Sequence, residues 1–287
     1  MSLKAAFIGL GAMGAPMAGH LHDRGLLVAV GNRSQAKAEE LAAQLGVAAP
    51  AGLAELAAQC EVIALCVSAD ADVLAVVEAL RPGLKPGSVV IDHSTVAPAT
   101  AQQAAARLAE VGVQFLDAPV SGGVEGAKNG KLSVMVGGDA AVLERVRPVL
   151  EAYGARIVHM GPVGAGQATK AVNQVLVAGI AQGVTEGLAL GEALGLDPER
   201  LIPVLASGAA GSWFLEKRGA SMLRNEFSVG FKLALLHKDL GIVRGIAEQA
   251  GSDRSVIERA LADYATLMAQ GHGDEDISAL IRLKRPA

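Results

Sequence analysis

The chain has 287 residues, which is long enough for two domains of ordinary size. It is 51% hydrophobic but only 3% aromatic, so small aliphatic residues and 35 glycines supply most of the apolar mass. This composition favours helices packed closely on a parallel sheet and argues against an all-β fold. The formal net charge is −4 and the basic residues are scattered, which argues against a nucleic-acid-binding protein.

The cysteines and the longest apolar stretch bear on metal binding and on the compartment. Cys60 and Cys66 have no histidine or cysteine partner at metal-ligand spacing, so we predict reduced thiols and no metal site. Residues 165–194 are apolar but include Lys170 and two glutamates, which indicates a buried helix rather than a membrane span. The first residues run directly into a strand pattern, which predicts no signal peptide. We therefore expect a cytoplasmic protein without membrane contact.

In the first half of the chain, short apolar runs alternate with helical patterns. The runs that predict strands are residues 5–9, 27–30, 62–67, 89–92, 114–117 and 132–136. Amphipathic segments between them predict helices at 35–45, 72–80 and 98–111. Alternating strands and helices indicate right-handed βαβ units. We predict a Rossmann-type, doubly wound parallel sheet over residues 1–162.

The pattern changes after Gly161-Pro162-Val163-Gly164, and helical patterns continue to the end of the chain. Residues 165–194 contain no proline, so as one helix they would span about 45 Å. Asp197-Pro198 and Asp253-Arg254 have the composition of helix starts. The tail 271–287 is predicted to be short and polar. We expect an all-helical second domain over residues 163–287.

A glycine fingerprint, GxGxxG, follows the first predicted strand and precedes a helix. Its first glycine permits a tight turn, its second lets the backbone approach a pyrophosphate, and its third lets helix and strand pack closely. The pattern predicts dinucleotide binding, with a plain tight turn as the alternative. The residues concerned are Gly9, Leu10, Gly11, Ala12, Met13 and Gly14.

The end of the second predicted strand bears on the choice of cofactor. An NAD site usually offers a carboxylate there for the ribose 2′-hydroxyl, but this chain has Asn32, Arg33 and Ser34. Arg33 can pair with a 2′-phosphate and Ser34 can hydrogen-bond it. NADP(H) is therefore the favoured cofactor, with NAD(H) as the alternative. In the second interpretation, Arg33 only begins a solvated helix.

Polar residues also gather where later strands end or helices begin. Asp92-His93-Ser94-Thr95-Val96 follows a strand, and Ser121-Gly122-Gly123 offers backbone N–H groups beside a hydroxyl, as a carboxylate requires. Lys170, Asn173 and Gln174 share one face of a helix by their spacing. A lysine there could serve as proton donor and acceptor, or it could be salt-bridged or extend its ammonium to water.

These motifs, in this order, resemble the β-hydroxyacid dehydrogenase family. The family includes 3-hydroxyisobutyrate dehydrogenases, tartronate semialdehyde reductases and plant-type glyoxylate/succinic semialdehyde reductases. The resemblance covers nearly the whole chain and rests on four segments: the glycine fingerprint, residues 117–130, residues 164–173, and Lys238-Asp239-Leu240.

The resemblance implies an oxidoreductase that transfers a hydride between NADP(H) and a small β-hydroxy acid or its semialdehyde. Lys170 matches the catalytic lysine, which would donate or accept the proton. Ser121, Gly122 and Gly123 match the segment that binds the substrate carboxylate, and Thr95 matches a residue near both nicotinamide and substrate. The other matching positions are Asn173, Gln174, Phe231 and Asp239 for substrate, and Leu65, Cys66, Val67 and Lys238 for cofactor. The family also implies a homodimer or homotetramer formed through the helical domain.

Some departures from the family pattern leave the substrate open. The family often has asparagine four residues after the lysine, where this chain has Gln174 preceded by Asn173. That pair is similar to the tartronate semialdehyde reductases, but Ser228-Val229 is not. The alternatives are a glyoxylate/succinic semialdehyde reductase, an imine reductase, or a non-catalytic NADP-binding sensor. Imine reductases generally lack the lysine, which counts against them.

Three histidines lie near predicted junctions. His93, His159 and His237 form no pair with metal-ligand spacing, so we expect capping or surface roles for them.

Overall fold

The computed structural model describes residues 3–285 and divides into two compact units, Met1–Lys170 and Ala171–Ala287. Each unit has its own hydrophobic core. The functions expected for residues 1–162 and 163–287 stay predictions, because a division into units does not test them.

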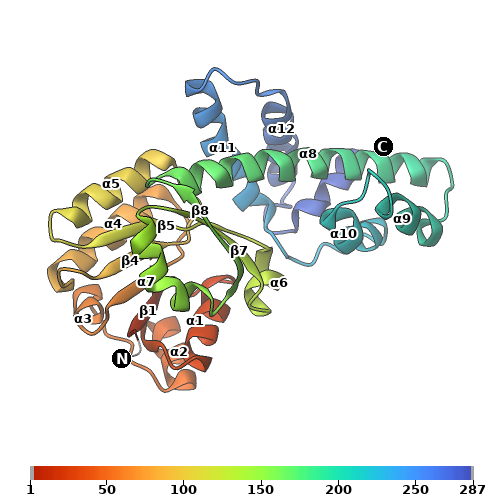
Figure 1. Ribbon diagram of the computed structural model, residues 1–287. Coiled ribbons are helices and arrows are strands. Elements are labelled where there is room, and N and C mark those ends of the chain that lie inside the picture. Colours follow the sequence, from red (N-terminus) through yellow and green to blue (C-terminus); the bar gives the residue numbers. More distant parts are fainter. Residues whose placement is uncertain (1–2, 286–287) are drawn as a thin grey trace. The chain divides into compact units, whose positions relative to one another are not determined.

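The first unit is built on one sheet (Figure 1). Its strands are β1 (Ala5–Ile8), β2 (Leu27–Gly31), β3 (Val62–Leu65), β4 (Val89–Asp92), β5 (Gln114–Asp117), β6 (Val120–Ser121), β7 (Leu132–Gly137) and β8 (Gly154–Gly161). They are ordered β2-β1-β3-β4-β5-β7-β6, and β8 pairs with β7. Strands β1 to β5 are parallel to their neighbours, while β7 runs antiparallel to β5 and β6. Strands β2 and β3 pair with β1 on opposite sides. The topological switch point of the sheet therefore lies at the carboxyl ends of β1 and β3.

Helices cover both faces of this sheet. They are α1 (Gly14–Asp23), α2 (Gln35–Leu45), α3 (Leu53–Ala58), α4 (Asp70–Leu80), the 3₁₀ helix η1 (Arg81–Gly83), α5 (Pro98–Ala109), α6 (Gly123–Lys128) and α7 (Ala140–Leu150). Side chains alternate along β1, so Phe7 belongs to the core formed with α1, α2, α6 and α7, and Ile8 to the core formed with α3, α4 and α5. The predicted doubly wound fold is confirmed.

Two strands were not expected from the sequence, and both are peripheral. Strand β6 has two residues, which is too short to produce a period. Strand β8 is paired only through β7, and most of its side chains are exposed. A strand without a buried face lacks the apolar alternation by which strands are recognised.

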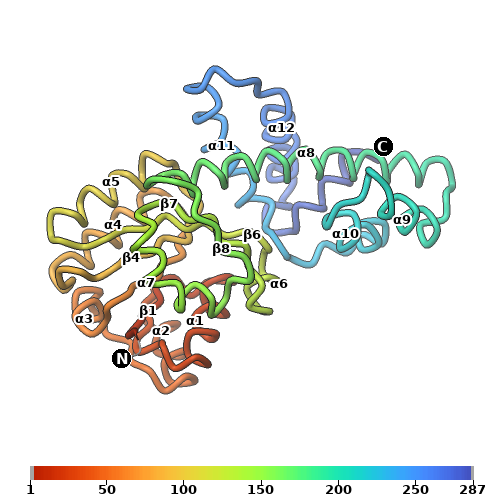
Figure 2. Tube along the Cα trace, in the orientation of Figure 1, coloured from red at the N-terminus to blue at the C-terminus, as the bar shows by residue number. Residues whose placement is uncertain are grey.

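The second unit is helical. Helix α8 (Ala165–Ala193) begins in the first unit and continues into the second, followed by α9 (Pro198–Ala206), α10 (Trp213–Leu223), α11 (Leu233–Gln249), α12 (Ser255–Ala269) and the 3₁₀ helix η2 (Ile277–Leu283). Between β8 and residue 285 the structure contains no strand, so the all-helical prediction is confirmed. Helices α11 and α12 lie side by side, as do α9 and α10 (Figure 2).

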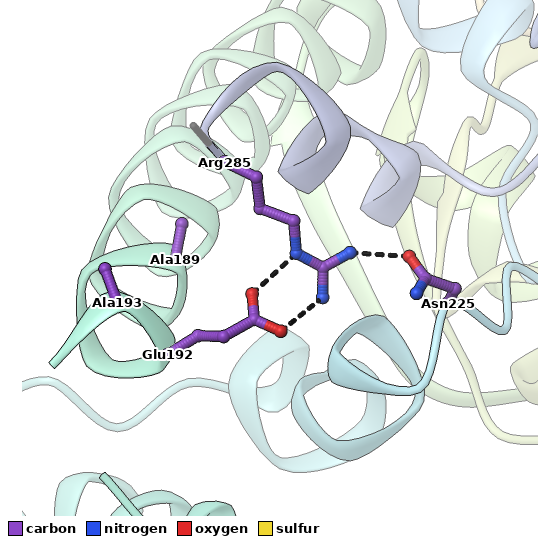
Figure 3. Close-up of a pocket in the computed structure, with 5 residues that line it drawn as sticks. All are labelled: Ala189, Glu192, Ala193, Asn225 and Arg285. Atoms are coloured by element: carbon purple, nitrogen blue, oxygen red, sulfur yellow. Dashed lines mark hydrogen bonds and ion pairs between the residues drawn. The ribbon is translucent and has the colours of Figure 1, made fainter. Parts of the chain in front are cut away.

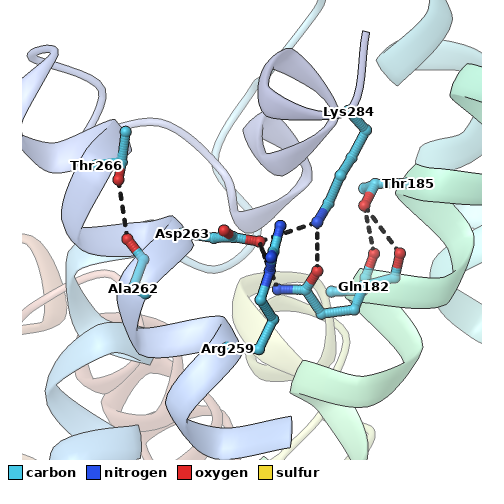
Figure 4. Close-up of polar contacts among 8 residues, drawn as sticks. Gln182, Thr185, Arg259, Ala262, Asp263, Thr266 and Lys284 are labelled. Atoms are coloured by element: carbon cyan, nitrogen blue, oxygen red, sulfur yellow. Dashed lines mark hydrogen bonds and ion pairs between the residues drawn. The ribbon is translucent and has the colours of Figure 1, made fainter.

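The prediction of a merely polar tail is wrong for residues 277–281. In η2, Ala279, Leu280 and Ile281 are fully buried in the core of the second unit. Just beyond them, Lys284 Nζ donates to Gln182 Oε1 at 2.7 Å and to Asp263 Oδ2 at 2.9 Å (Figure 4). The tail therefore ties α8 to α12.

Candidate functional site

The glycine turn between β1 and α1 has two glycines that the protein's own packing requires. A Cβ on Gly9, whose φ is +92°, would lie 2.2 Å from the Cys66 carbonyl oxygen, and one on Gly14 would lie 1.9 Å from the Gly9 oxygen. A Cβ on Gly11 would meet nothing within 4 Å, and its φ is not positive. Internal packing therefore does not explain Gly11, the position where the fingerprint predicts the close approach of a pyrophosphate.

The start of α1 suits an anion. Its N-cap residue, Met13, provides no side-chain hydrogen bond, and the first turn contains no acidic residue. The neighbouring Leu10 N–H is occupied by Asn32 Oδ1 at 3.1 Å, while Asn32 Nδ2 donates to the Ser34 carbonyl. Asn32 thus braces the turn, a role not foreseen from the sequence. N–H groups at a helix start bind phosphate, so these residues fit a dinucleotide cofactor.

Arg33 extends into solvent at the end of β2. Its side chain is 92% exposed, and Nη1 lies 3.9 Å from Asp72 Oδ1. Ser34, the N-cap residue of α2, makes no side-chain capping bond. Both side chains are therefore available to an incoming anion.

The loop after β3 lies against the glycine turn. Cys66 N–H donates to the Ile8 carbonyl at 2.9 Å, and Val67 N–H donates to Ser94 Oγ at 2.9 Å. Leu65, at the end of β3, is fully buried. The structure thus brings together the three segments predicted to bind cofactor after β1, β3 and β4.

Gln167 holds the segment that contains Thr95. Its Nε2 donates to the Ser94 carbonyl at 2.7 Å, and its Oε1 accepts from Val96 N–H at 3.1 Å. The backbone on both sides of Thr95 is therefore fixed to α8. The sequence analysis missed Gln167, because these partners lie about 70 residues away in the chain.

Asp117, at the end of β5, caps the start of α8. Its Oδ1 accepts from Gly164 N–H at 2.8 Å and its Oδ2 from Gln167 N–H at 2.9 Å. Burial raises the pKa of Asp117, and these backbone hydrogen bonds oppose the shift. Lys170 follows on the second turn of the same helix and is only 7% exposed. The beginning of α8, and with it the backbone of Lys170, is thus anchored to β4 and β5.

His93 is part of the core, so the expected capping or surface role is wrong for it. Its Nδ1–H donates to the Ala118 carbonyl at 2.7 Å, and its Nε2 accepts from the Tyr153 hydroxyl at 2.7 Å. Burial lowers the pKa of His93 to about 4. The imidazole is therefore neutral near pH 7, and it joins the segments that follow β4, β5 and α7.

Asp92 beside it is also buried. Its Oδ1 accepts from Ser94 N–H at 2.8 Å, whereas its Oδ2 has no hydrogen-bond partner. Burial raises the pKa of Asp92 to about 7.

The segment Ser121-Gly122-Gly123 forms the turn from β6 into α6. Ser121 pairs with Ser133 of β7, and Gly122 and Gly123 have φ values of +129° and +60°. These conformations favour glycine. The glycines predicted to bind the substrate carboxylate thus lie in a turn whose backbone conformation favours glycine.

In the second unit, four predicted site residues form one hydrogen-bonded chain. Asn173 Nδ2 donates to Gln174 Oε1 at 2.8 Å, and Gln174 Nε2 donates to Asp239 Oδ2 at 2.7 Å. Lys238 Nζ lies 2.9 Å from Asp239 Oδ1. The structure thus joins the start of α8 in this unit to α11.

Phe231 is held elsewhere in the second unit. Its N–H donates to Asp276 Oδ2 at 2.9 Å, and Gly230 N–H donates to the same oxygen at 2.9 Å. Asp276 is buried just before η2, so the C-terminal segment fixes the backbone of Phe231.

Comparisons with known proteins cover the whole of this architecture. The family model for the NAD binding domain of 6-phosphogluconate dehydrogenase matches residues 4–161, and the model for NAD-binding of NADP-dependent 3-hydroxyisobutyrate dehydrogenase matches residues 164–284. The chain belongs to the β-hydroxyacid dehydrogenase family. It is an oxidoreductase that acts on hydroxyl groups with a pyridine nucleotide cofactor.

Individual relatives and solved structures resemble it over nearly their full length. The NAD-dependent L-serine dehydrogenase of Pseudomonas aeruginosa is 37% identical, over 99% of this chain and 98% of that protein. The structure of Mycobacterium tuberculosis 3-hydroxyisobutyrate dehydrogenase with L-serine gives a TM-score of 0.91 at 34% identity, over 100% of both chains. Psf3 in complex with NADP+ and 2-OPP gives 0.89 at 28% identity, over 97% of this chain and 99% of that one.

A pocket of this β-hydroxyacid dehydrogenase lies near the C-terminal end of α8, and none of its lining residues is a predicted site residue. It is lined by Ala189, Glu192, Ala193, Asn225 and Arg285 (Figure 3). Arg285 Nε lies 2.6 Å from Glu192 Oε2, and Arg285 Nη1 donates to Asn225 Oδ1 at 2.5 Å. The Arg285 guanidinium, the cationic group among these lining residues, is already bound to Glu192 and Asn225. The pocket is therefore poorly suited to bind a substrate carboxylate.

Residues 3–285 of this β-hydroxyacid dehydrogenase contain no helix that combines the length and the apolar character needed to cross a membrane. Over the same residues, His, Cys, Asp and Glu side chains form no group able to hold a metal ion.

Proposed function

We propose that the protein is an NADP(H)-dependent dehydrogenase that interconverts a small β-hydroxy acid and its semialdehyde, of the 3-hydroxyisobutyrate or tartronate semialdehyde type. The observation that carries the proposal is the environment of Lys170. It is a buried lysine on a helix turn that Asp117 and Gln167 anchor to the strand ends where a Rossmann fold binds its ligands.

The cofactor would be bound by the backbone of residues 9–14, by residues 65–67 and Thr95, and by Asn32, Arg33, Ser34 and Lys238. When bound, its nicotinamide gives or takes the hydride. Arg33 would pair with the 2′-phosphate of NADP(H), since its guanidinium is 92% exposed and its ion pair with Asp72 is long, at 3.9 Å.

The substrate carboxylate would be bound by the Ser121 hydroxyl and by the N–H groups of Gly122 and Gly123. The Lys170 ammonium would donate a proton to the carbonyl oxygen during reduction, and the neutral amine would accept it during oxidation. Thr95, Asn173, Gln174, Phe231 and Asp239 would orient the substrate and help to exclude water.

The proposal also includes a cytoplasmic location and a homodimer or homotetramer formed through residues 163–287. Helix α8 supports the oligomer because it exposes an apolar face. The face consists of Val172, Leu176, Ile180, Gly183, Gly187 and Leu190, continued by Leu194 directly after the helix, and is here called the α8 stripe. Four of its members, Val172, Leu176, Leu190 and Leu194, are 60% exposed or more.

Initial rates test the proposal. NADPH and NADH oxidation would be measured with tartronate semialdehyde, methylmalonate semialdehyde, succinic semialdehyde and glyoxylate. The reverse reaction would be followed with L-serine and 3-hydroxyisobutyrate. We expect turnover in this set, with NADPH preferred. Tight NADPH binding without any turnover would instead favour a non-catalytic NADP sensor.

Lys170→Ala separates binding from chemistry. We expect the variant to keep its NADPH affinity in a fluorescence titration and to lose kcat by several orders of magnitude, because both proton donor and acceptor are gone. Near-normal turnover would remove Lys170 from the mechanism.

A further inference from the structure

The peptide between Cys66 and Val67 lies directly against the glycine turn of the first unit. Cys66 N–H donates to the Ile8 carbonyl at 2.9 Å. The Cys66 carbonyl oxygen is so close to Gly9 that a Cβ on that glycine would lie 2.2 Å from it. A change in the direction of this carbonyl would therefore alter the contacts of the first glycine in the turn.

The opposite side of the same peptide is held by Ser94. Val67 N–H donates to Ser94 Oγ at 2.9 Å. The peptide is trans and planar, so its N–H and its C=O point in opposite directions and can only turn together. Ser94 thus fixes the N–H on one side and, through the rigid peptide, the Cys66 carbonyl on the other side.

Ser94 is itself held firmly and is only 1% exposed. Its N–H donates to Asp92 Oδ1 at 2.8 Å, and its carbonyl accepts from Gln167 Nε2 at 2.7 Å. Burial raises the pKa of Asp92 to about 7, and a hydrogen bond from the Ser94 side chain opposes that shift. A hydroxyl has one proton to donate and lone pairs with which to accept, so it can bind Asp92 and the Val67 N–H at the same time.

We propose that Ser94 is a positioning residue for nucleotide binding, which acts by holding the Cys66–Val67 peptide in the orientation that packs its carbonyl on the glycine turn. This inference rests on the proposed function, because it takes residues 9–14 and 65–67 as the cofactor site. Without the hydroxyl, the Val67 N–H loses its acceptor and the peptide is free to rotate. Binding of the cofactor must then restore a single orientation, at a cost in affinity.

Fluorescence titrations of Ser94→Ala with nucleotide test this role. We expect the Kd of NADPH and that of NADH to rise alike, by about 10-fold, because the lost contact acts on the glycine turn and not on the 2′-phosphate. The KM for NADPH should rise by a similar factor while kcat falls by less than about threefold, because Gln167 still holds the backbone on both sides of Thr95. The matched control is Ser88→Ala, because Ser88 is a buried serine at the opposite end of β4, and it should leave both Kd values unchanged.

Ser94→Cys adds a graded comparison, because a thiol sulfur is only a weak acceptor. Its Kd values should lie between those of the wild type and Ser94→Ala, and it decides the question alone if Ser94→Ala does not fold in a urea unfolding experiment.

The outcomes separate this inference from the proposed function. Wild-type affinity for both nucleotides in the folded Ser94 variants, an equal loss in Ser88→Ala, or a loss confined to NADPH would overturn the inference and leave the proposed function standing. A wild type that binds neither nucleotide would count against the proposed function itself. The absence of turnover with every substrate tested would also count against the proposed function, while the titrations would still support or overturn the role of Ser94.

Discussion

At the scale of single residues, two neighbouring buried groups respond to pH in opposite directions. Asp92 has its pKa raised from 3.8 to about 7, so its contribution to stability is present at low pH and is lost as the pH rises through about 7. His93 has its pKa lowered from 6.5 to about 4, so its contribution is present at neutral pH and is lost as the pH falls through about 4. Between pH 4 and 6.5 the two effects partly cancel.

Asp92→Asn isolates the first effect, because asparagine does not titrate. Relative to wild type, the variant should gain about 1–4 kcal/mol in its free energy of unfolding as the pH rises from 4 to 8. Urea unfolding at several pH values measures this gain, and His93 cancels from the comparison because both proteins contain it. Parallel pH curves for the two proteins would show that Asp92 is ionised at little cost in the fold.

The second residue-scale prediction concerns Arg33. Its guanidinium is 92% exposed and lies 3.9 Å from Asp72, so it is accessible to a 2′-phosphate, and removing it should weaken binding of that group. We expect Arg33→Ala to raise the Kd of NADPH about 10- to 100-fold while changing that of NADH by less than about threefold. Fluorescence titrations with both nucleotides provide the measurement. Equal losses would mean that Arg33 does not recognise the 2′-phosphate.

Sequence reasoning succeeded for residues whose role follows from local geometry and failed for those with distant partners. Gly9 and Gly14 were assigned correctly as required by a tight turn and by close packing, since both requirements arise within the GxGxxG segment. Asp117 was included only as the first residue of the segment 117–130 that resembles the family, and its capping role was not predicted, because its partners lie about 50 residues further along the chain. The pairing of Gln174 with Asp239, 65 residues apart, was invisible for the same reason.

At the scale of elements, the limits of α8 could be predicted within one residue, because the segment is long, apolar and free of proline. What the pattern did not reveal is how the helix begins. Its N-terminal N–H groups are satisfied by a carboxylate from β5 rather than by a capping residue adjacent in sequence. Strand β8 escaped prediction for a related reason, since an exposed edge strand carries no apolar alternation.

Asp117→Ala tests this capping of α8. It should lower the free energy of unfolding by about 2–4 kcal/mol, because two N–H groups in a buried setting lose their acceptor. The matched control is Asp139→Ala, which removes an exposed N-cap carboxylate from α7 and should cost about 1 kcal/mol. Chemical unfolding of both variants gives the comparison. Similar losses for the two would mean that α8 does not depend on its buried cap.

At the scale of the whole molecule, the second unit has a hydrophobic core and also an exposed apolar surface along α8. The residues of the α8 stripe are spaced three or four positions apart. This is the spacing of the apolar face of a helix that packs against another element. A Cβ on Gly183 or Gly187 would meet nothing within 4 Å, so these glycines leave room for a close helix approach. Their lack of side chains costs helix stability, which packing against a second copy of the chain would offset.

Leu176→Glu therefore tests the oligomer. Wild type should sediment as a dimer or tetramer of the 29.1 kDa chain, and the variant should dissociate at concentrations about 100-fold higher, because an unpaired charge would be buried in the contact. Val204→Glu is the matched control: Val204 on α9 is 64% exposed, Leu176 is 61% exposed, and Val204 lies outside the stripe. Analytical ultracentrifugation over a dilution series distinguishes the cases. If Leu176→Glu keeps the wild-type assembly while Val204→Glu disrupts it, the subunits associate through α9 rather than α8. If wild type is itself a monomer, the apolar face of α8 does not mediate self-association.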